Sequence, residues 1–308
     1  MTTGDGLTVS AQGLGCMRMG DSARPGSTEE AADVIGRALD LGVTFLDTAD
    51  MYDRGHNEEV VGRALRGRRD EAVLGTKFGV VRGDGDSFAL RGDAAYVRQA
   101  CEASLRRLGV DTIDVYYLHR RDPAVPIEET VAAMAELVAE GKVRHLGLSA
   151  VTGAELRAAH AVHPIAVVQS EWSLCNRELE RMVPVCDELG VGVVSYAPQG
   201  RGLLGARLDS AGARLAELGP RYAELPSLLR KMADRRGVRP GQIALAWVHR
   251  QTEVWGLPVV PIPGTTRPEH LAENVAAAGI ELDAEELALL DLGVTGAESG
   301  QPALRSHG

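Results

Sequence analysis

The protein is short of several residue types, and each shortage narrows what it can be. Its 308 residues hold 33 Lys and Arg against 43 Asp and Glu, a formal net charge of −10. This acidic balance argues against binding to nucleic acid or to an anionic membrane surface. No apolar run reaches the length of about 18 residues that a membrane-spanning helix requires. The stretch 1–15 also lacks the charged and apolar regions of a signal peptide.

Cysteine is scarce as well. The four cysteines are Cys16, Cys101, Cys175 and Cys186. They have no C-x-x-C spacing, and the histidines form neither an H-E-x-x-H motif nor a Cys/His metal spacing. We therefore expect free thiols, a cytoplasmic location and no metal site.

Lysine is the scarcest of the charged residues. Only Lys77, Lys142 and Lys231 occur among the 33 Lys and Arg residues, so arginine supplies nearly all the positive charge. Lys77 stands near the end of the apolar run AVLGTKF (72–78). A lysine retained at this place indicates a task that arginine does not perform.

What the chain does contain is a repeated alternation of short apolar runs and amphipathic segments. The eight predicted strands are 13–17, 43–47, 72–78, 112–119, 143–149, 166–170, 191–196 and 259–263. The clearest predicted helices are 27–42, 94–108, 127–140, 177–189 and 284–292. The first opens with Ser27 and Glu30, which have the spacing of a capping box.

Alternating strands and helices with short connections indicate right-handed parallel βαβ units. Eight such units in about 250 residues or more are typical of a TIM barrel. We predict an α/β fold with one (β/α)8 barrel domain over 1–308. Residues 198–225 are predicted to form a long loop over one barrel face, and a C-terminal helix and tail end the domain.

Polar side chains finish six of the predicted strands. They are Asp47, Lys77, His119, Ser149, Gln169 and Tyr196. Active sites of such barrels lie at the carboxyl ends of the strands, so these side chains should surround one mouth. Tyr52 follows Asp47 on the loop over the same mouth. Each residue alone is more often a solvated strand end or a packing residue, and it is their convergence that indicates a catalytic site.

The combination of Asp, Tyr, Lys and His suits the reduction of a carbonyl group. A tyrosine hydroxyl can supply the proton that the carbonyl oxygen needs, but its usual pKa is about 10. A neighbouring ammonium should lower that pKa, and a carboxylate should keep the partly buried ammonium charged. Lys77 is a compact charge that fits between Tyr52 and Asp47, whereas the arginine fork is larger. His119 can hydrogen-bond the substrate oxygen.

At this point the chain resembles the aldo-keto reductase family, in particular bacterial and plant members similar to pyridoxal reductases and auxin-induced proteins. The matching stretches include FLDTADMYDRGHNEEVVGRAL, GTKFG, GKVRHLGLS, VVQSEWSL, YAPQGRGLL and PIPGTTRPEHLAENV. The resemblance implies NADPH-dependent reduction of an aldehyde or ketone by the tetrad Asp47, Tyr52, Lys77 and His119.

The resemblance also implies cofactor-binding and substrate-binding positions. Ser149 and Gln169 would hold the nicotinamide amide, and Tyr196 would stack on its ring. The pyrophosphate loop would comprise Ala197, Pro198, Gln199, Gly200, Gly202 and Leu203. Residues toward the adenosine would be Ile262, Gly264, Thr265, Thr266, Arg267, Glu273 and Asn274, with Thr265, Thr266 and Arg267 on the 2′-phosphate. Met51, Arg120 and Trp172 are expected to contact the substrate, although Trp172 suits a core position equally well.

Three positions depart from the family pattern. Ala150 stands where an asparagine is common, and this removes one polar contact to the carboxamide. Ala197 and Gln199 replace the usual Ser and Leu, which matters little if the loop binds through backbone N–H groups.

A rival interpretation is a redox-sensing, NADPH-binding regulatory subunit on the same barrel. The chain is expected to be a monomer or a homo-oligomer.

Overall fold

The computed structural model describes residues 1–83, 87–205 and 207–292. Eight parallel strands form one sheet in the order β1-β2-β3-β6-β7-β8-β9-β10, so each strand–helix unit adds the next strand. Their bounds are β1 Gly13–Gly15, β2 Phe45–Asp47, β3 Val73–Phe78, β6 Ile113–Leu118, β7 Val143–Ser149, β8 Val167–Glu171, β9 Gly192–Tyr196 and β10 Val259–Pro261. All eight predicted strands are therefore confirmed, and so is the TIM-barrel fold.

The two ends of the sheet approach each other closely. A Cβ atom added to Gly15 in β1 would lie 2.9 Å from the carbonyl oxygen of Ile262, just after β10. One added to Gly264 would lie 2.8 Å from the carbonyl oxygen of Gly15. Only glycine permits such backbone contact, and the sheet forms a nearly closed barrel.

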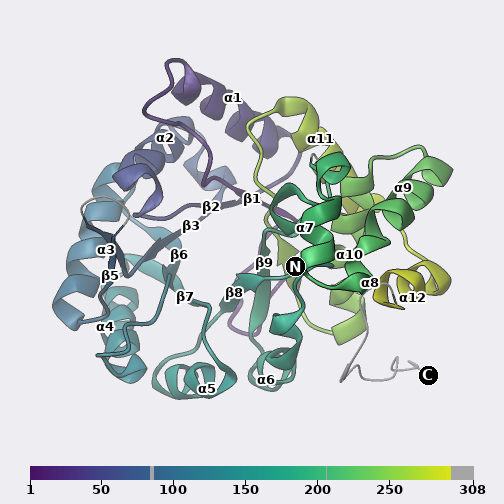
Figure 1. Cartoon of the computed structure of the whole chain (residues 1–308). Helices are drawn as coiled ribbons and strands as arrows, with labels where there is room; N and C mark the ends of the chain where they lie inside the picture. Colours follow the sequence, from purple (N-terminus) through teal and green to yellow (C-terminus); the bar gives the residue numbers. More distant parts are fainter. Residues whose placement is uncertain (84–86, 206, 293–308) are drawn as a thin grey trace.

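Helices surround the strands as an outer ring (Figure 1). Those of at least seven residues are α1 Ser27–Asp40, α2 His56–Ala64, α3 Ala94–Leu108, α4 Ile127–Ala139, α5 Gly153–Val162, α6 Val183–Leu189, α9 Leu225–Arg236, α10 Pro240–Trp255, α11 Pro268–Ala276 and α12 Ala284–Leu292. The predicted helix 177–189 is divided, because Pro184 occupies the first turn of α6 and has no N–H to continue a preceding turn.

The predicted capping box at the start of α1 is wrong. Gly26, with φ 80°, is the N-cap residue and makes no side-chain cap. The hydroxyl of Ser27 instead donates to the carbonyl oxygen of Asp21 at 2.7 Å, and Glu30 pairs with Arg24. Local sequence spacing therefore did not decide the start of this helix.

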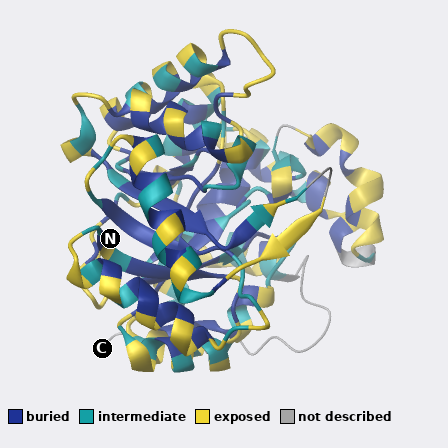
Figure 2. Ribbon diagram, turned by 90° about the vertical axis from the view of Figure 1, so that its left-hand side faces the viewer, coloured by how far each residue is buried: buried dark blue, intermediate teal, exposed yellow. Residues whose placement is uncertain are grey.

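Apolar side chains pack in two layers on either side of the barrel wall. The larger layer lies between strands and helices, and the smaller one fills the barrel interior. Leu7 and Val9, from the N-terminal segment, belong to the interior cluster together with Phe45 and Tyr117. In Figure 2 the strands of the barrel are buried, whereas the outer helix faces are exposed.

Two insertions lie outside the eightfold repeat. A two-stranded antiparallel sheet, β4 Val80–Arg82 and β5 Phe88–Leu90, follows β3. The predicted loop 198–225 contains short helical turns, α7 Gly212–Glu217 and α8 Pro220–Ala223 among them. The predicted C-terminal helix is confirmed as α12, and the tail after it lies outside the described residues.

Three expectations drawn from composition and motif spacing can be compared with the described residues. All four cysteines are free. Within 1–83, 87–205 and 207–292, no helix has both the length and the apolar character needed to cross a membrane. No group of three or more metal-ligating side chains occurs there either.

Candidate active site

The polar residues at the strand ends meet at a cavity of about 1000 Å³ over the barrel mouth. Asp47 ends β2, and His119 directly follows β6. Both line the cavity together with Tyr52, which begins a 3₁₀ turn on the loop after β2. Lys77 of β3 lies beneath this lining and is fully buried. The predicted convergence of the four side chains is thus present.

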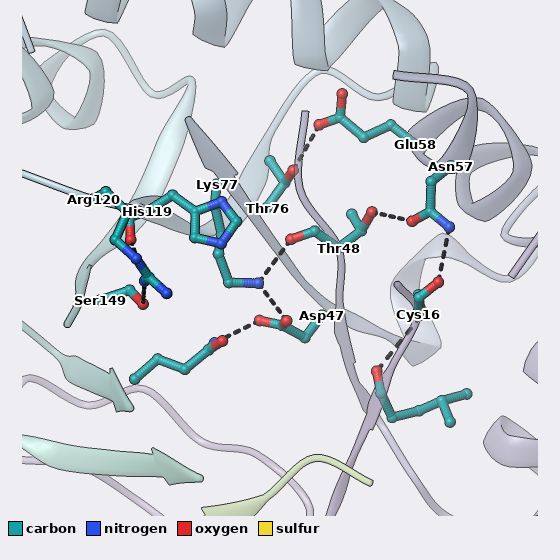
Figure 3. A network of polar contacts seen from close by, with 12 residues as sticks. Cys16, Asp47, Thr48, Asn57, Glu58, Thr76, Lys77, His119, Arg120 and Ser149 are labelled. Atoms are coloured by element: carbon teal, nitrogen blue, oxygen red, sulfur yellow. Dashed lines mark hydrogen bonds and ion pairs between the residues drawn. The ribbon is translucent and has the colours of Figure 1, made fainter. Parts of the chain in front are cut away.

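Lys77 connects the other members of the group. Its ammonium donates to the Asp47 carboxylate and, at 2.9 Å, to the carbonyl oxygen of Thr48 (Figure 3). The Nζ atom lies 5.5 Å from the centroid of the Tyr52 ring. Burial alone would lower the pKa of Lys77, but the negative charge of Asp47 is the main opposing influence and the pKa is raised. The ammonium therefore stays charged in the barrel interior.

The expected lowering of the Tyr52 pKa is wrong in its net direction. Burial is the largest influence and raises the pKa of the phenol above its usual value. The Lys77 ammonium acts in the predicted direction but only offsets part of that effect, and the Asp47 charge opposes it. Tyr52 is consequently protonated at neutral pH.

His119 is uncharged at neutral pH. Burial, and after it the positive charges of Lys77 and Arg120, lower its pKa to about 2. Its ring meets that of Tyr52 edge-on, with centroids 5.8 Å apart. The buried Nδ1 atom has no hydrogen-bond partner among the described residues. A neutral imidazole in this position can orient a polar substrate atom without adding charge.

Two neighbouring strand ends support the tetrad in ways the sequence did not reveal. Gln169, expected to face the cofactor, donates its amide N–H to the second carboxylate oxygen of Asp47 at 2.7 Å. Ser149 accepts a hydrogen bond of 3.1 Å from Arg120, whose same nitrogen donates to the carbonyl oxygen of His119. Asp47 is therefore held from two sides, by Lys77 and by Gln169.

Side chains at the start of helix α2 form hydrogen bonds beside the two strands that carry Asp47 and Lys77. The amide of Asn57 accepts from the hydroxyl of Thr48 at 2.5 Å and donates to the carbonyl oxygen of Cys16 (Figure 3). It also donates to the carbonyl oxygen of Met19. The Thr48–Asn57 bond closes the loop that carries Tyr52. We name this contact the Thr48–Asn57 clamp.

A second contact from α2 reaches the other strand. The buried carboxylate of Glu58 accepts from the hydroxyl of Thr76 at 2.6 Å and is paired with Arg107. Thr76 directly precedes Lys77, and side chains alternate between the two faces of a strand. Lys77 therefore points into the barrel while its neighbour is held on the outside.

The Aldo/keto reductase family model matches residues 12–292. The chain belongs to the aldo/keto reductase family. As a member of this family it is an oxidoreductase.

Solved structures agree with this assignment. The reductase is 32% identical to an aldo/keto reductase from Klebsiella pneumoniae in complex with NADP and acetate, with a TM-score of 0.78 and 98% of each chain covered. It is 28% identical to a glycerol dehydrogenase from Gluconobacter oxydans, with a TM-score of 0.84, 94% of this chain and 93% of that chain covered. It is 29% identical to the holo form of an aldo-keto reductase from Bacillus halodurans, with a TM-score of 0.79 and 98% of each chain covered.

Most of the positions expected to bind cofactor or substrate line the same cavity. These are Met51, Arg120, Ser149, Gln169, Tyr196, Ala197, Pro198, Gln199, Gly202, Ile262, Gly264, Thr265, Glu273 and Asn274. The loop after β9 turns sharply, since Ala197 has φ 49° and Arg201 has φ 56°. Gln199 connects this loop to α10 and α11, because its amide donates to the carbonyl oxygen of Gly241 and to the side chain of Asn274, both at 3.1 Å.

Five expected positions are not among the lining residues. Trp172 is fully buried in the main core, edge-on to Trp247, and its indole N–H donates to Glu180 at 3.2 Å. It is therefore a core residue and not a wall of the cavity. The described lining also leaves out Gly200, Leu203, Thr266 and Arg267. Arg267 is largely exposed and pairs with Glu269 at 3.3 Å.

Several lining residues at the Glu273 end of the cavity were missed, and two of them carry basic side chains. These two are Arg239, at the start of α10, and His270, in α11. Arg239 lies 3.5 Å from the Glu273 carboxylate. No sequence signal singled out Arg239, because arginine is so common in this chain and Glu273 lies 34 positions further along it.

Proposed function

We propose that this reductase transfers hydride from NADPH to the carbonyl carbon of an aldehyde or ketone, with Tyr52 as the general acid. The observation that carries the proposal is the meeting of Tyr52 and His119 at one cavity, with the buried Lys77–Asp47 pair directly behind them. Bound NADPH would supply the hydride.

The protein's own groups would handle the proton. The hydroxyl of Tyr52 is protonated at neutral pH and donates its proton to the carbonyl oxygen as that oxygen gains negative charge. The Lys77 ammonium then stabilises the tyrosinate that remains, and Asp47 keeps Lys77 charged. Neutral His119 orients the carbonyl oxygen.

The charge of the cavity fits a phosphate-bearing cofactor. In a chain of net charge −10, the cavity gathers six arginines against three acidic residues. The arginines are Arg18, Arg120, Arg201, Arg207, Arg230 and Arg239, and the acids are Asp47, Asp209 and Glu273. Asp47 is already neutralised by Lys77. The remaining excess of positive charge suits the phosphates of a dinucleotide.

Residues beside Glu273 and Asn274 would hold the adenosine end. Arg239 and His270 line that end of the cavity and can meet a 2′-phosphate. We place Arg239 before Arg267 for that contact, because Arg239 lines the cavity and Arg267 does not. Arg120 and Met51 remain proposed substrate contacts.

The test is a panel of small aldehydes and ketones offered to the purified protein with NADPH. Consumption of NADPH that depends on the carbonyl compound, with the matching alcohol as product, supports the proposal. Tight NADPH binding with no turnover on any member of the panel would contradict it and favour the redox-sensing regulatory subunit.

A further inference from the structure

The β4–β5 hairpin carries one apolar face. In its antiparallel register Val80 is paired with Leu90, and Arg82 with Phe88. Residues directly opposite each other point to the same side, and every second residue of a strand does so too. Val80, Phe88 and Leu90 therefore share a face with Arg82, while Val81 and Ala89 lie on the other.

That face is turned toward the catalytic cavity. Val80, Phe88 and Leu90 all line it, together with Tyr52 and His119. Phe88 is 56% exposed and Leu90 38%, and β5 is the fully exposed strand in Figure 2. Exposing large apolar side chains to water is unfavourable in free energy unless another group covers them.

Exposed apolar residues are concentrated at this cavity. Among the described residues, seven large hydrophobic side chains are exposed: Met17, Leu41, Phe88, Leu90, Val162, Leu218 and Leu289. Three of them, Met17, Phe88 and Leu90, line the one cavity that holds Tyr52. Met51, the residue before Tyr52, adds a further apolar contact on the same lining.

The hairpin is tied to the barrel mouth at its base. The N–H of Arg91 donates to the carbonyl oxygen of Gly79 at 3.0 Å, and the N–H of Gly92 donates to Asp122 at 3.3 Å. The guanidinium of Arg82 lies 5.5 Å from the centre of the Phe88 ring. The two hydrogen bonds at the base hold the apolar face beside the site, although the hairpin is not part of the barrel.

We infer that this face is a specificity wall for the apolar arm of the substrate. The wall comprises Met17, Val80, Phe88 and Leu90. The reductase would then prefer carbonyl compounds that carry an alkyl or aryl chain several carbons long over the smallest aldehydes. The inference rests on the proposed function and adds the substrate class to it.

A series of straight-chain aldehydes from propanal to heptanal tests the wall. With saturating NADPH, kcat/KM should rise about 2- to 4-fold per added methylene, the upper value corresponding to about 0.8 kcal/mol. The gain should lie mainly in KM, because apolar contact with a remote chain serves ground state and transition state alike.

Three variants make the test specific. Phe88→Ser should flatten the dependence on chain length while leaving propanal nearly unaffected. Phe88→Leu should keep most of it. Leu41→Ser, which removes an exposed apolar residue away from the cavity, should match the wild type.

The outcomes separate the inference from the proposed function. If the wild type reduces no aldehyde, the proposed function itself fails. If it reduces all of them with a kcat/KM independent of chain length, or if Phe88→Ser keeps the wild-type slope, the wall alone is overturned. If the wild type sediments as a dimer and Phe88→Ser as a monomer with an unchanged slope, the wall is likewise overturned and the face is assigned to a second copy of the chain.

Discussion

At the scale of single residues, Lys77 shows why a chain dominated by arginine retains a lysine. Its side chain is completely buried, and its nitrogen contacts Asp47 and the carbonyl oxygen of Thr48, which leaves no room for a larger group. A guanidinium is planar, larger and spreads its charge over three nitrogens. Such a group would displace Asp47 or Tyr52.

Lys77→Arg should therefore lower kcat about 100-fold or more, because a misplacement of about 1 Å can cost that much. NADPH affinity should change little, since Lys77 lies beneath the cavity lining. Steady-state kinetics and NADPH fluorescence titration measure the two quantities. Wild-type turnover in Lys77→Arg would show that position 77 requires a positive charge and not the particular shape of lysine.

The meeting of Asp47, Tyr52, Lys77 and His119 at one place was predictable from the sequence, but the net effect of burial and charge on their pKa values was not. Lys77 does favour the ionised form of Tyr52, as predicted. The depth of burial, which a linear sequence does not display, outweighs it and also makes His119 neutral. The partner of Gln169 was missed for a similar reason, because Asp47 lies 122 positions away in the chain.

At the scale of elements, the loop after β2 is held in a strained form. Asp53 and Arg54, just after Tyr52, have φ values of 45° and 54°, where side chains other than glycine are disfavoured. A turn of this kind persists when its ends are fixed by other contacts. The Thr48–Asn57 clamp fixes them.

Thr48→Val should loosen the clamp without changing the shape of the side chain. We expect kcat to fall about 10-fold, because Tyr52 is no longer held in register with Lys77, while NADPH affinity is retained. Thr48→Ser keeps the hydroxyl and should restore kcat. Equal losses in the valine and serine variants would mean that the methyl group matters and the hydrogen bond does not.

The end of β7 offers a second test at this scale. Ala150 has φ 52°, a conformation that asparagine and glycine accept more readily than alanine. Ala150→Asn and Ala150→Gly should both relieve strain and raise the melting temperature, by an amount equivalent to about 0.5–1 kcal/mol.

Only the asparagine can add a contact to the cofactor, and it should tighten NADPH binding by one hydrogen bond of about 0.5–1.5 kcal/mol. Thermal unfolding and fluorescence titration separate the two effects. If the asparagine and glycine variants bind NADPH equally well, nothing is missing at this position.

The elements that sequence predicted well are those with a strong hydrophobic pattern. The barrel strands are runs such as IDVYYL (113–118), buried on both faces, and their position needs no knowledge of partners. The β4–β5 hairpin was not predicted, because its strands are only three residues each and β5 is exposed throughout. Its existence depends on contacts with the barrel mouth.

At the scale of the whole molecule, charge is distributed unevenly. The chain is acidic overall, yet arginines line the cavity. An anionic cofactor is therefore repelled by the protein at long range and attracted at its site. Arg239 and Arg267 give a matched comparison, since both are arginines with largely exposed side chains but only Arg239 lines the cavity.

Arg239→Ala should raise the KM for NADPH about 10-fold, by loss of a charged hydrogen bond of about 1.5 kcal/mol, and should leave the KM for NADH unchanged. Arg267→Ala should stay near the wild type with both cofactors. Added salt should weaken NADPH binding more in the wild type than in Arg239→Ala. If Arg267→Ala raised the KM for NADPH and Arg239→Ala did not, Arg267 would be the residue that contacts the 2′-phosphate.

The central claim is that Tyr52 donates the proton to the substrate, while Lys77 and Asp47 stabilise the tyrosinate that remains. The variant Tyr52→Phe tests this claim most directly. The measurement is kcat for aldehyde reduction at neutral pH, with the Kd for NADPH determined on the same preparation. Removing one hydroxyl should lower kcat roughly 100- to 10,000-fold, while NADPH binding stays within about 2-fold of the wild type, because the ring and its contact with His119 remain. Turnover within a few-fold of the wild type would show that another group supplies the proton, and the account given for this site would be wrong.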